Sequence, residues 1–414
     1  MYGAPGRAAF ESVQPAMQTA DIPVVYVTDR AAETKRDGGV TYGFGRSPGI
    51  SFGTATVAIS PRVEWNGLVD LSTSETREHR YLSKVSGVEP IGEIPSTARL
   101  LEPREGRLRM KPDAMATVRD GQQKLFKLLS RWLDHTDRKE TFVFVHGFNN
   151  TFDHSVIRLS HAWHFGGRQG VPIVFSWPAG SGGLKSYTYD RESGEFAIVH
   201  LKMLLITLAR CPQIERIHLV SHSRGTDVAV TAMREMNAEA RGYLRSGGLA
   251  ALLHDDLEAM NRADAPEVHE MLKIETLVLA APDLDFDVFA QRFFGENVIR
   301  AANRTVIYFS RADFALSVAR WAFRSRRRIG ALRLEDLAPE VQRWCAAIDA
   351  LELIHCDVRG HSSHSYILQH PAAFSDLIQV ITRGLKPGAE HGRPLKRIGD
   401  TIWELSNDYL RSMP

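Results

Sequence analysis

The sequence contains few cysteines and no long apolar run. Its 414 residues include only Cys211, Cys345 and Cys356, whose odd number and wide spacing argue against a disulfide framework or a zinc knuckle. No stretch approaches the roughly 18 consecutive apolar residues of a membrane helix. The first residues lack the basic segment and apolar run of a signal peptide. We therefore expect a cytoplasmic location for the chain as given; an export signal upstream of Met1 would not show here.

An excess of charge of either sign is also absent. The 51 basic residues nearly cancel the 49 acidic ones, which leaves a formal net charge of +2. A protein built chiefly to hold nucleic acid carries a larger basic excess, so nucleic acid is not expected as a partner. Hydrophobic residues make up 43% and charged residues 24% of the chain. This balance is typical of a globular protein with a large core, and it leaves the oligomeric state undetermined.

From about residue 115 the chain alternates between helical and strand-like segments. Apolar residues recur at helical spacing from 118 to 132, and helices are also expected near 154–164, 195–209 and after 224. Apolar runs that are nearly continuous indicate strands covered by helices on both faces. The sequence therefore predicts an α/β class with a mostly parallel, doubly wound sheet. The predicted strands are 141–145, 171–177, 216–220, 274–280, 305–309 and 351–357.

The chain divides into four predicted segments. Residues 1–20 are rich in Gly, Pro and Ala and are expected to form a flexible leader. Residues 21–112 contain short β-like runs separated by turn residues, which predicts an N-terminal β-rich extension of the sheet. Residues 113–385 are predicted to form the α/β core, and residues 386–414 a C-terminal tail with a short helix.

A serine lies between a predicted strand and a predicted helix. The strand at 216–220 leads into Ser221-His-Ser-Arg-Gly225, and a helical pattern follows. A nucleophile elbow has this order and needs small residues two positions before and after the serine, because strand and helix approach closely there. Ser221 replaces the usual first glycine with another small residue. We therefore predict an α/β-hydrolase fold with Ser223 as nucleophile and the Arg224 backbone N–H in the oxyanion hole.

The same fold requires a second N–H donor and an acidic residue. The loop after the strand at 141–145 contains Gly147 followed by Phe148, whose backbone N–H is the candidate donor. After the nucleophile, the acid precedes the histidine in the chain. Asp313, which follows the strand at 305–309, is the leading acid. Two aspartates after the preceding strand, Asp283 and Asp285, are alternatives.

Two histidines compete for the role of the base. His361 and His364 both follow the last predicted strand, and His364 is preferred because a helical pattern begins directly after it. In the resulting mechanism His364 takes the proton of Ser223, Asp313 orients the imidazole, and water releases the acyl group. Histidine pairs at i, i+3 spacing have no carboxylate nearby, so neither a metal nor another cofactor is expected.

The motifs together resemble a family of bacterial α/β-hydrolases of unknown function within the esterase/lipase superfamily. The resemblance extends from about residue 22 to 380 and implies the hydrolase fold and a serine triad, without a substrate. Relatives often have methionine after the nucleophile, where this chain has Arg224, and often carry an export or lipoprotein signal. The matching pieces are Tyr26-Val-Thr-Asp-Arg30, Phe52-Gly53, Val143-Phe-Val-His-Gly-Phe-Asn-Asn150, Phe175-Ser-Trp-Pro178, Tyr187 with Asp190, the Ser223 elbow, Ala280-Ala-Pro-Asp283, Ser310-Arg-Ala-Asp313 and His364-Ser-Tyr366.

These residues predict a serine esterase or lipase-like hydrolase. The expected substrate is a small molecule with a carboxylic ester, and thioesters or amides are variants of the same chemistry. Two other functions stay open: a non-catalytic binding protein on a hydrolase scaffold, and an acyltransferase with an acceptor other than water. The intact order of Ser223, Asp313 and His364 favours an enzyme.

Two further segments carry expectations of their own. The glycine-rich and then aromatic segment 180–190 leaves a strand beside the elbow and is predicted to border the site as a lid. The basic cluster Arg320–Arg328 is predicted by default to be a solvent-exposed face. The sharper alternative is contact with anionic lipid headgroups or an acidic substrate.

Overall fold

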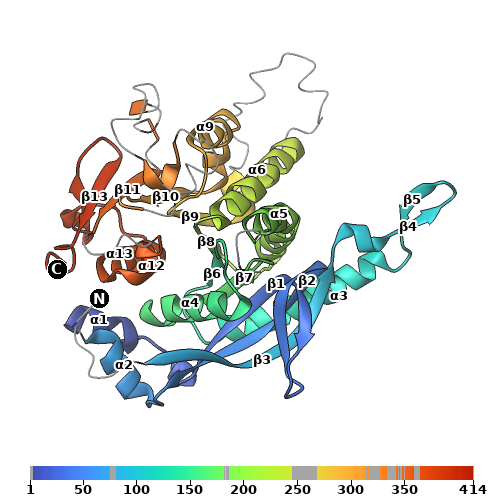
Figure 1. The fold of residues 1–414 in the computed structure, drawn as a ribbon, viewed down its shortest axis with the longest axis horizontal. Helices are drawn as coiled ribbons and strands as arrows, with labels where there is room; N and C mark the ends of the chain where they lie inside the picture. Colours follow the sequence, from blue (N-terminus) through green and yellow to red (C-terminus); the bar gives the residue numbers. More distant parts are fainter. Residues whose placement is uncertain are drawn as a thin grey trace.

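The chain is organised around an 11-stranded sheet. Its strand order is β12-β13-β11-β10-β9-β8-β6-β7-β1-β2-β3, and a separate two-stranded sheet is formed by β4 and β5 (Figure 1). The computed structural model describes residues 3–74, 81–180, 182, 186–244, 268–313, 316, 327–332, 342–343, 345, 347–348, 350–358 and 364–413.

The central strands of the large sheet run parallel to one another. Each is nearly or wholly buried, as expected for strands with helices on both faces. The predicted α/β class and mostly parallel sheet are therefore confirmed. These strands are β6 (Glu140–Val145), β7 (Val171–Ser176), β8 (Arg216–His222), β9 (Ile274–Ala280), β10 (Arg304–Phe309) and β11 (Leu351–Asp357).

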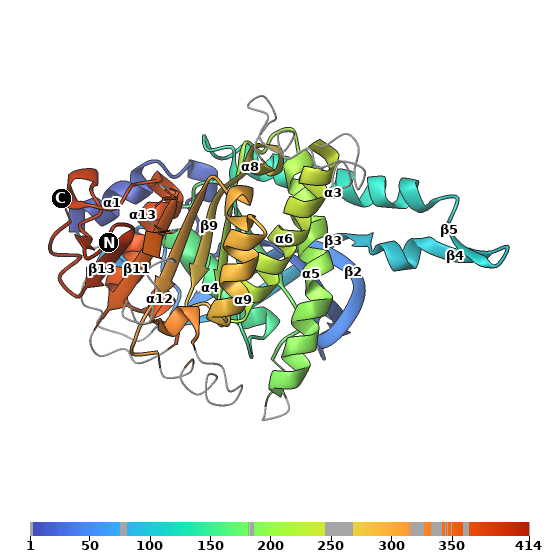
Figure 2. The ribbon, with the colours of Figure 1, turned by 90° about the horizontal axis from the view of Figure 1, so that it is seen from above.

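Helices cover the sheet on both sides (Figures 1 and 2). One face carries α3 (Ala114–Leu133), α4 (Phe152–Phe165), α12 (Tyr366–Gln369) and α13 (Pro371–Arg383). The other face carries α5 (Ser186–Arg210), α6 (Gly225–Leu244) and α9 (Phe286–Ala290), with the short α8 (Val268–Leu272) at one end. Within the described part of the chain, no helix combines the length and apolar character needed to cross a membrane.

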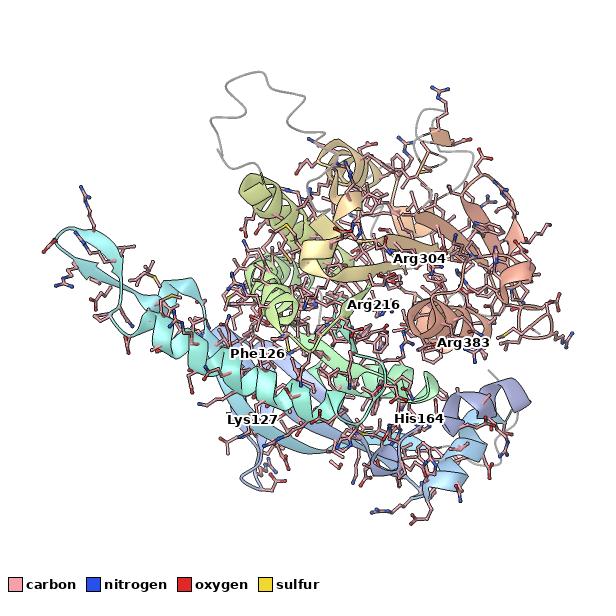
Figure 3. The ribbon with its side chains drawn as sticks, turned by 180° about the vertical axis from the view of Figure 1, so that it is seen from behind. Phe126, Lys127, His164, Arg216, Arg304 and Arg383 are labelled. Atoms are coloured by element: carbon pink, nitrogen blue, oxygen red, sulfur yellow. The ribbon has the colours of Figure 1, made fainter. Side chains whose placement is uncertain are left out.

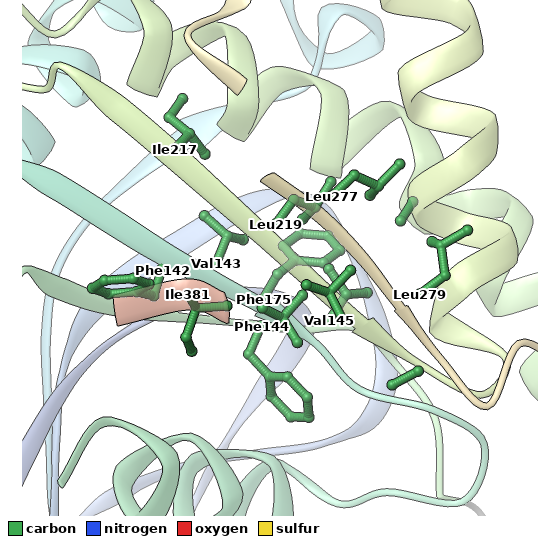
Figure 4. Close-up of a cluster of buried hydrophobic side chains, with 14 of the residues drawn as sticks. Phe142, Val143, Phe144, Val145, Phe175, Ile217, Leu219, Leu277, Leu279 and Ile381 are labelled. Atoms are coloured by element: carbon green, nitrogen blue, oxygen red, sulfur yellow. The ribbon is translucent and has the colours of Figure 1, made fainter. Parts of the chain in front are cut away.

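The core lies where the middle strands meet these helices. Neighbouring strands contribute bulky side chains that interdigitate across the sheet, with Ile381 reaching in from α13 (Figure 4). Burying apolar side chains of this size stabilises the fold by about 1.5–3 kcal/mol each before entropy is counted. The labelled members of the cluster are Phe142, Val143, Phe144, Val145, Phe175, Ile217, Leu219, Leu277, Leu279 and Ile381.

The N-terminal part of the chain extends the sheet. Strand β1 (Ile22–Thr34) pairs parallel with β7 on one side and antiparallel with β2 (Val40–Ser60) on the other, and β3 (Leu82–Pro95) follows at the edge. The hairpin of β4 (Leu101–Arg104) and β5 (Arg107–Met110) projects with the start of α3 away from the body (Figures 1 to 3).

Both ends of the chain differ from the expectation. The predicted flexible leader instead forms α1 (Gly3–Glu11) because Phe10 is buried, with its ring against Trp65 of α2 (Trp65–Thr73) and His164 of α4. The predicted tail with a short helix instead extends the sheet. Strand β13 (Ile402–Ser406) pairs parallel with β11, and β12 (Lys396–Arg397) pairs with β13. The tail also contains a single 3-10 turn at Ala389–His391 among its described residues.

A buried ionic network ties the C-terminal end to the core. The carboxylate of Asp376 on α13 accepts two hydrogen bonds from Arg393, at 2.8 and 2.9 Å. It also accepts the hydroxyl groups of Tyr308 on β10, at 2.6 Å, and Tyr409, at 2.8 Å. Arg393 donates in addition to Glu352 of β11. All four carboxylate positions are filled, which is the condition under which a buried charge is tolerated.

Replacing Asp376 with asparagine should destabilise the protein strongly. The change leaves buried Arg393 without its principal counter-charge, and breaking a buried pair from one side costs about 3–5 kcal/mol. Urea unfolding of Asp376→Asn against the wild type measures this cost. The matched control is Asp400→Asn, whose carboxylate is 80% exposed. Equal losses of stability in both variants would contradict the assignment.

The stability supplied by Asp376 should also depend on pH. Burial raises the pKa of Asp376, but the charge and hydrogen bonds of Arg393 outweigh it and bring the pKa below its ordinary value. The contribution is therefore present above about pH 4, the ordinary range of aspartate, and is lost as pH falls through the folded-state pKa. The difference in the free energy of unfolding between the wild type and Asp376→Asn should accordingly become smaller as the pH is lowered, which urea unfolding at several pH values measures.

Candidate active site

Ser223 lies at the sharp turn between β8 and α6. Its φ of 55° is in the left-handed region, which non-glycine residues rarely adopt. Two contacts hold this conformation: the Ser223 N–H donates to the carbonyl of Ala280 at 2.9 Å, and the Ser223 carbonyl accepts the Thr226 hydroxyl at 2.6 Å. The turn places Ser223 at the carboxyl end of the parallel sheet, where the loops after neighbouring strands converge.

Small residues around the elbow are required by close backbone contacts. A Cβ at Gly225 would lie 2.3 Å from the carbonyl oxygen of His146, and a Cβ at Gly147 would lie 2.6 Å from the Cβ of Ser223. Neither approach leaves room for a side chain. Ser221 is accommodated because it is buried and its hydroxyl donates to the Val278 carbonyl at 3.1 Å. The departure from the usual glycine is therefore satisfied locally.

Ser223, His364 and Asp313 form one hydrogen-bonded line. The Nε2 of His364 lies 2.5 Å from the Oγ of Ser223, and its Nδ1 lies 2.6 Å from the Oδ2 of Asp313. The other carboxylate oxygen of Asp313 accepts the backbone N–H of Leu316 at 3.1 Å. Asp313 is fully buried, whereas one fifth of the His364 side chain is exposed. The imidazole thus lies between a buried carboxylate and the hydroxyl of Ser223, a residue that is 5% exposed.

The alternative acids are used elsewhere. Asp283 accepts the Tyr187 hydroxyl at 3.1 Å and the Arg328 guanidinium at 2.8 Å. Asp285 caps α9 by accepting the N–H groups of residues 287 and 288. The alternative base, His361, lies outside the described residues.

His222 supports the loop that carries His364. It is buried beside Ser223, and its Nε2 lies 3.2 Å from the backbone carbonyl oxygen of His364. Burial and then the neighbouring His364 lower the pKa of His222 well below its ordinary value. A neutral His222 donates one N–H to that carbonyl, and its ring lies against the ring of His364, with centroids 5.1 Å apart. This residue therefore positions the loop.

Arg30 organises the loops next to Ser223. It lies within β1, two residues beyond the last pair of β1 with β7, and is 1% exposed. Each of its five N–H groups has an acceptor. Burial lowers the pKa of Arg30 to about 10, so the guanidinium is still charged at neutral pH. Its acceptors are the Ser176 hydroxyl, the Nε2 of His146, and the backbone carbonyls of Gly43, Asn150 and Ala179.

Asp190 binds backbone N–H groups of the loops that follow β6 and β7, whose carbonyls Arg30 binds. Its carboxylate accepts the backbone N–H of Asn149 at 2.9 Å and that of Gly180 at 3.3 Å. Arg30 takes carbonyls and Asp190 takes N–H groups, so together they fix the loops that follow β6 and β7. Within the described residues, the backbone N–H of Phe148 and that of Arg224 donate no hydrogen bond. Both predicted oxyanion donors therefore flank Ser223 with their hydrogen-bonding capacity unused.

His146 completes this support. Its ring is fully buried and stacks on Trp177, with centroids 5.1 Å apart. Burial, followed by the charge of Arg30, lowers the pKa of His146 well below its ordinary value. The neutral ring donates from Nδ1 to the Gly147 carbonyl at 2.9 Å and accepts from Arg30 at Nε2. Sequence reasoning recognised Arg30 and Asp190 only as pieces of family motifs and assigned no role to them.

The predicted lid and the predicted basic cluster lie only partly within the described residues. Residues 181 and 183–185 of the predicted lid, and Arg320, Arg324 and Arg326 of the basic cluster, lie outside the described residues. Reading the whole cluster as one surface is wrong at Arg328, which is 7% exposed and bonded to Asp283. No group of three or more metal-ligating side chains occurs among the residues that the structure describes.

Comparison with known proteins agrees with this geometry. Residues 122–383 match a family described as alpha/beta hydrolase of unknown function (DUF900). The match covers more than half of the chain and includes Ser223, Asp313 and His364. Neither the curated proteins nor the solved structures contain a match to the chain. The chain therefore belongs to this family of alpha/beta hydrolases, whose function is unknown.

Proposed function

We propose that the protein is a serine hydrolase that cleaves a carboxylic ester through an acyl-enzyme on Ser223. One observation carries the proposal: His364 lies within hydrogen-bond distance of both the Ser223 hydroxyl and the buried carboxylate of Asp313. A hydroxyl is a weak nucleophile unless a base removes its proton as it attacks. An imidazole held by a carboxylate supplies that base and is stabilised when it becomes positively charged.

In the first half of the reaction, the Oγ of Ser223 attacks the ester carbonyl while Nε2 of His364 takes its proton. Asp313 stabilises the imidazolium that forms. The backbone N–H groups of Phe148 and Arg224 are the proposed donors to the negative oxygen of the tetrahedral intermediate. When the intermediate collapses, the C–O bond to the alcohol breaks and His364 returns its proton to the leaving oxygen.

In the second half, water replaces the alcohol. His364 removes a proton from water as it attacks the acyl-enzyme, and the carboxylic acid leaves while Ser223 regains its proton. Thioesters and amides follow the same steps with a different leaving atom, and an acyltransferase differs only in the acceptor. A non-catalytic scaffold is disfavoured because all three side chains are present and aligned.

Arg30 and Asp190 are proposed to hold the two oxyanion donors in place. These two residues do not contact the substrate in this proposal; they hold the backbone of residues 146–150 against Ser223. Because an oxyanion hole stabilises the transition state more than the bound substrate, loosening it should lower kcat more than it raises KM.

The nucleophile is tested by Ser223→Ala. We expect the wild type to hydrolyse p-nitrophenyl esters, with a rate that varies over short to long acyl chains, and Ser223→Ala to lose at least about 10⁴-fold in kcat. The control is Ser160→Ala, which removes a buried hydroxyl on α4 that donates to the Ile157 carbonyl of the same helix. Turnover by Ser223→Ala at the wild-type rate would refute the proposal.

The positioning role is tested by Arg30→Lys. Lysine keeps the charge but has three donors in place of five, so we expect kcat to fall about 10- to 100-fold with a small change in KM. The control is Arg36→Lys, at an exposed position. Steady-state kinetics on the preferred ester, with circular dichroism as a check of folding, distinguishes the outcomes. A rise in KM at constant kcat would instead place Arg30 in substrate binding.

A further inference from the structure

A cavity lies away from Ser223. It has a volume of about 310 Å³, within the usual range of small-molecule pockets. Its walls come from α2, α4, α12 and α13 and from the ends of β1, β2 and β3. None of Ser223, His364 and Phe148 lines it. Most of its lining is apolar, including Ile22, Ile59, Leu68, Leu71, Phe165 and Phe374.

One cation lines this apolar cavity without a counter-charge. Arg158 projects from α4, and among the described residues it has neither a hydrogen-bond partner nor a carboxylate partner. Burial lowers the pKa of Arg158, and no acidic side chain of the described residues raises it again. No described Asp or Glu side chain lines the cavity. A partly buried guanidinium with unused donors is costly, so a ligand acceptor that reaches it would be stabilised.

Other buried arginines of the molecule have hydrogen-bond acceptors that Arg158 lacks among the described residues. Arg30 uses all five donors, and Arg393 is bonded to Asp376 and Glu352. Arg168, also on this side of the sheet, donates to the Nδ1 of His164 and to the Met17 carbonyl. Arg158 differs from all three, because none of its donors has a partner among the described residues. The other three guanidinium groups are bonded within the protein, although the Nη2 of Arg168 has no hydrogen-bond partner.

The polar groups around the cavity are mostly engaged with one another. The hydroxyl of Ser72 lies 2.9 Å from the Nε2 of His164, the residue on α4 that Figure 3 labels. The hydroxyl of Ser83 lies 2.8 Å from the Nε2 of His161. These pairs leave Arg158 as the strongest donor that faces a ligand. The site thus combines one cation with apolar walls.

We propose that this cavity binds an amphipathic monocarboxylate. Its carboxylate pairs with the guanidinium of Arg158, which matches the two oxygens in a forked arrangement, and its apolar body contacts the walls on α2 and α13. The volume corresponds to about ten water-sized groups at roughly 30 Å³ each, which suits a chain of about eight carbons. This inference does not rest on the proposed hydrolase activity.

Calorimetric titration of the full-length protein tests the site, with octanoate, octanamide and inorganic phosphate as probes. We expect octanoate to bind, octanamide to bind at least about tenfold more weakly because it lacks the charge, and phosphate to bind no better than octanamide. Arg158→Met should weaken octanoate binding by about tenfold or more. Leu71→Trp should weaken it as well, by filling the cavity while Arg158 is retained. Arg131→Met, at an exposed position on α3, is the control.

Each contrary result would overturn the proposal. Equal affinity for octanoate and octanamide would remove the role of the charge, and phosphate binding as tightly as octanoate would remove the apolar part. Octanoate binding that Arg158→Met and Leu71→Trp leave unchanged would place the ligand elsewhere, and no octanoate binding would reject the site. We expect Arg158→Met to melt no lower than the wild type, since it removes a partly buried charge that has no partner among the described residues. If Arg158→Met does not fold, octanoate binding to Leu71→Trp tests the site in its place: weaker binding supports the site, and unchanged binding contradicts it.

Discussion

The guanidinium of Arg30 is the contact on which the arrangement around Ser223 depends. It is buried within β1 beside the carboxyl ends of β6 and β7, and its acceptors come from segments far apart in the chain. Parallel strands deliver loops to one edge of a sheet, but they do not fix the loops against one another. Arg30 and Asp190 do so, because one binds the carbonyls and the other the N–H groups of the same two loops.

A second buried network serves the other side of the site. Asp376 on α13 is bonded to Tyr308 of β10 and to Arg393. Strand β10 leads to Asp313, and α12 and α13 follow His364, so this network fixes the elements that carry the acid and the base. The two networks differ in kind: Arg30 is satisfied largely by neutral groups, and Arg393 by two carboxylates. In both, a buried charge is fully bonded, as a low-dielectric interior requires.

The parallel sheet and the position of Ser223 could be predicted because apolar runs, small residues and a turn serine are local signals. The acid could not be settled in that way, since Asp283 and Asp313 both follow strands. The contact of Asp313 with His364, and those of Asp283 with Tyr187 and Arg328, separate them. The role of Arg30 was hidden because its partners are distant in sequence. The strand at 402–406 was missed for the same reason: it exists through pairing with β11.

The most direct test of the central claim is covalent labelling by a fluorophosphonate, with the modified residue mapped by mass spectrometry. The account predicts a single adduct on Ser223, formed about 10³- to 10⁴-fold more slowly in Asp313→Asn, because the imidazole loses its orienting carboxylate. In Asp283→Asn labelling should be far less affected, since that carboxylate bonds Tyr187 and Arg328. No adduct on Ser223 in the folded wild type, or a larger loss in Asp283→Asn than in Asp313→Asn, would contradict the account.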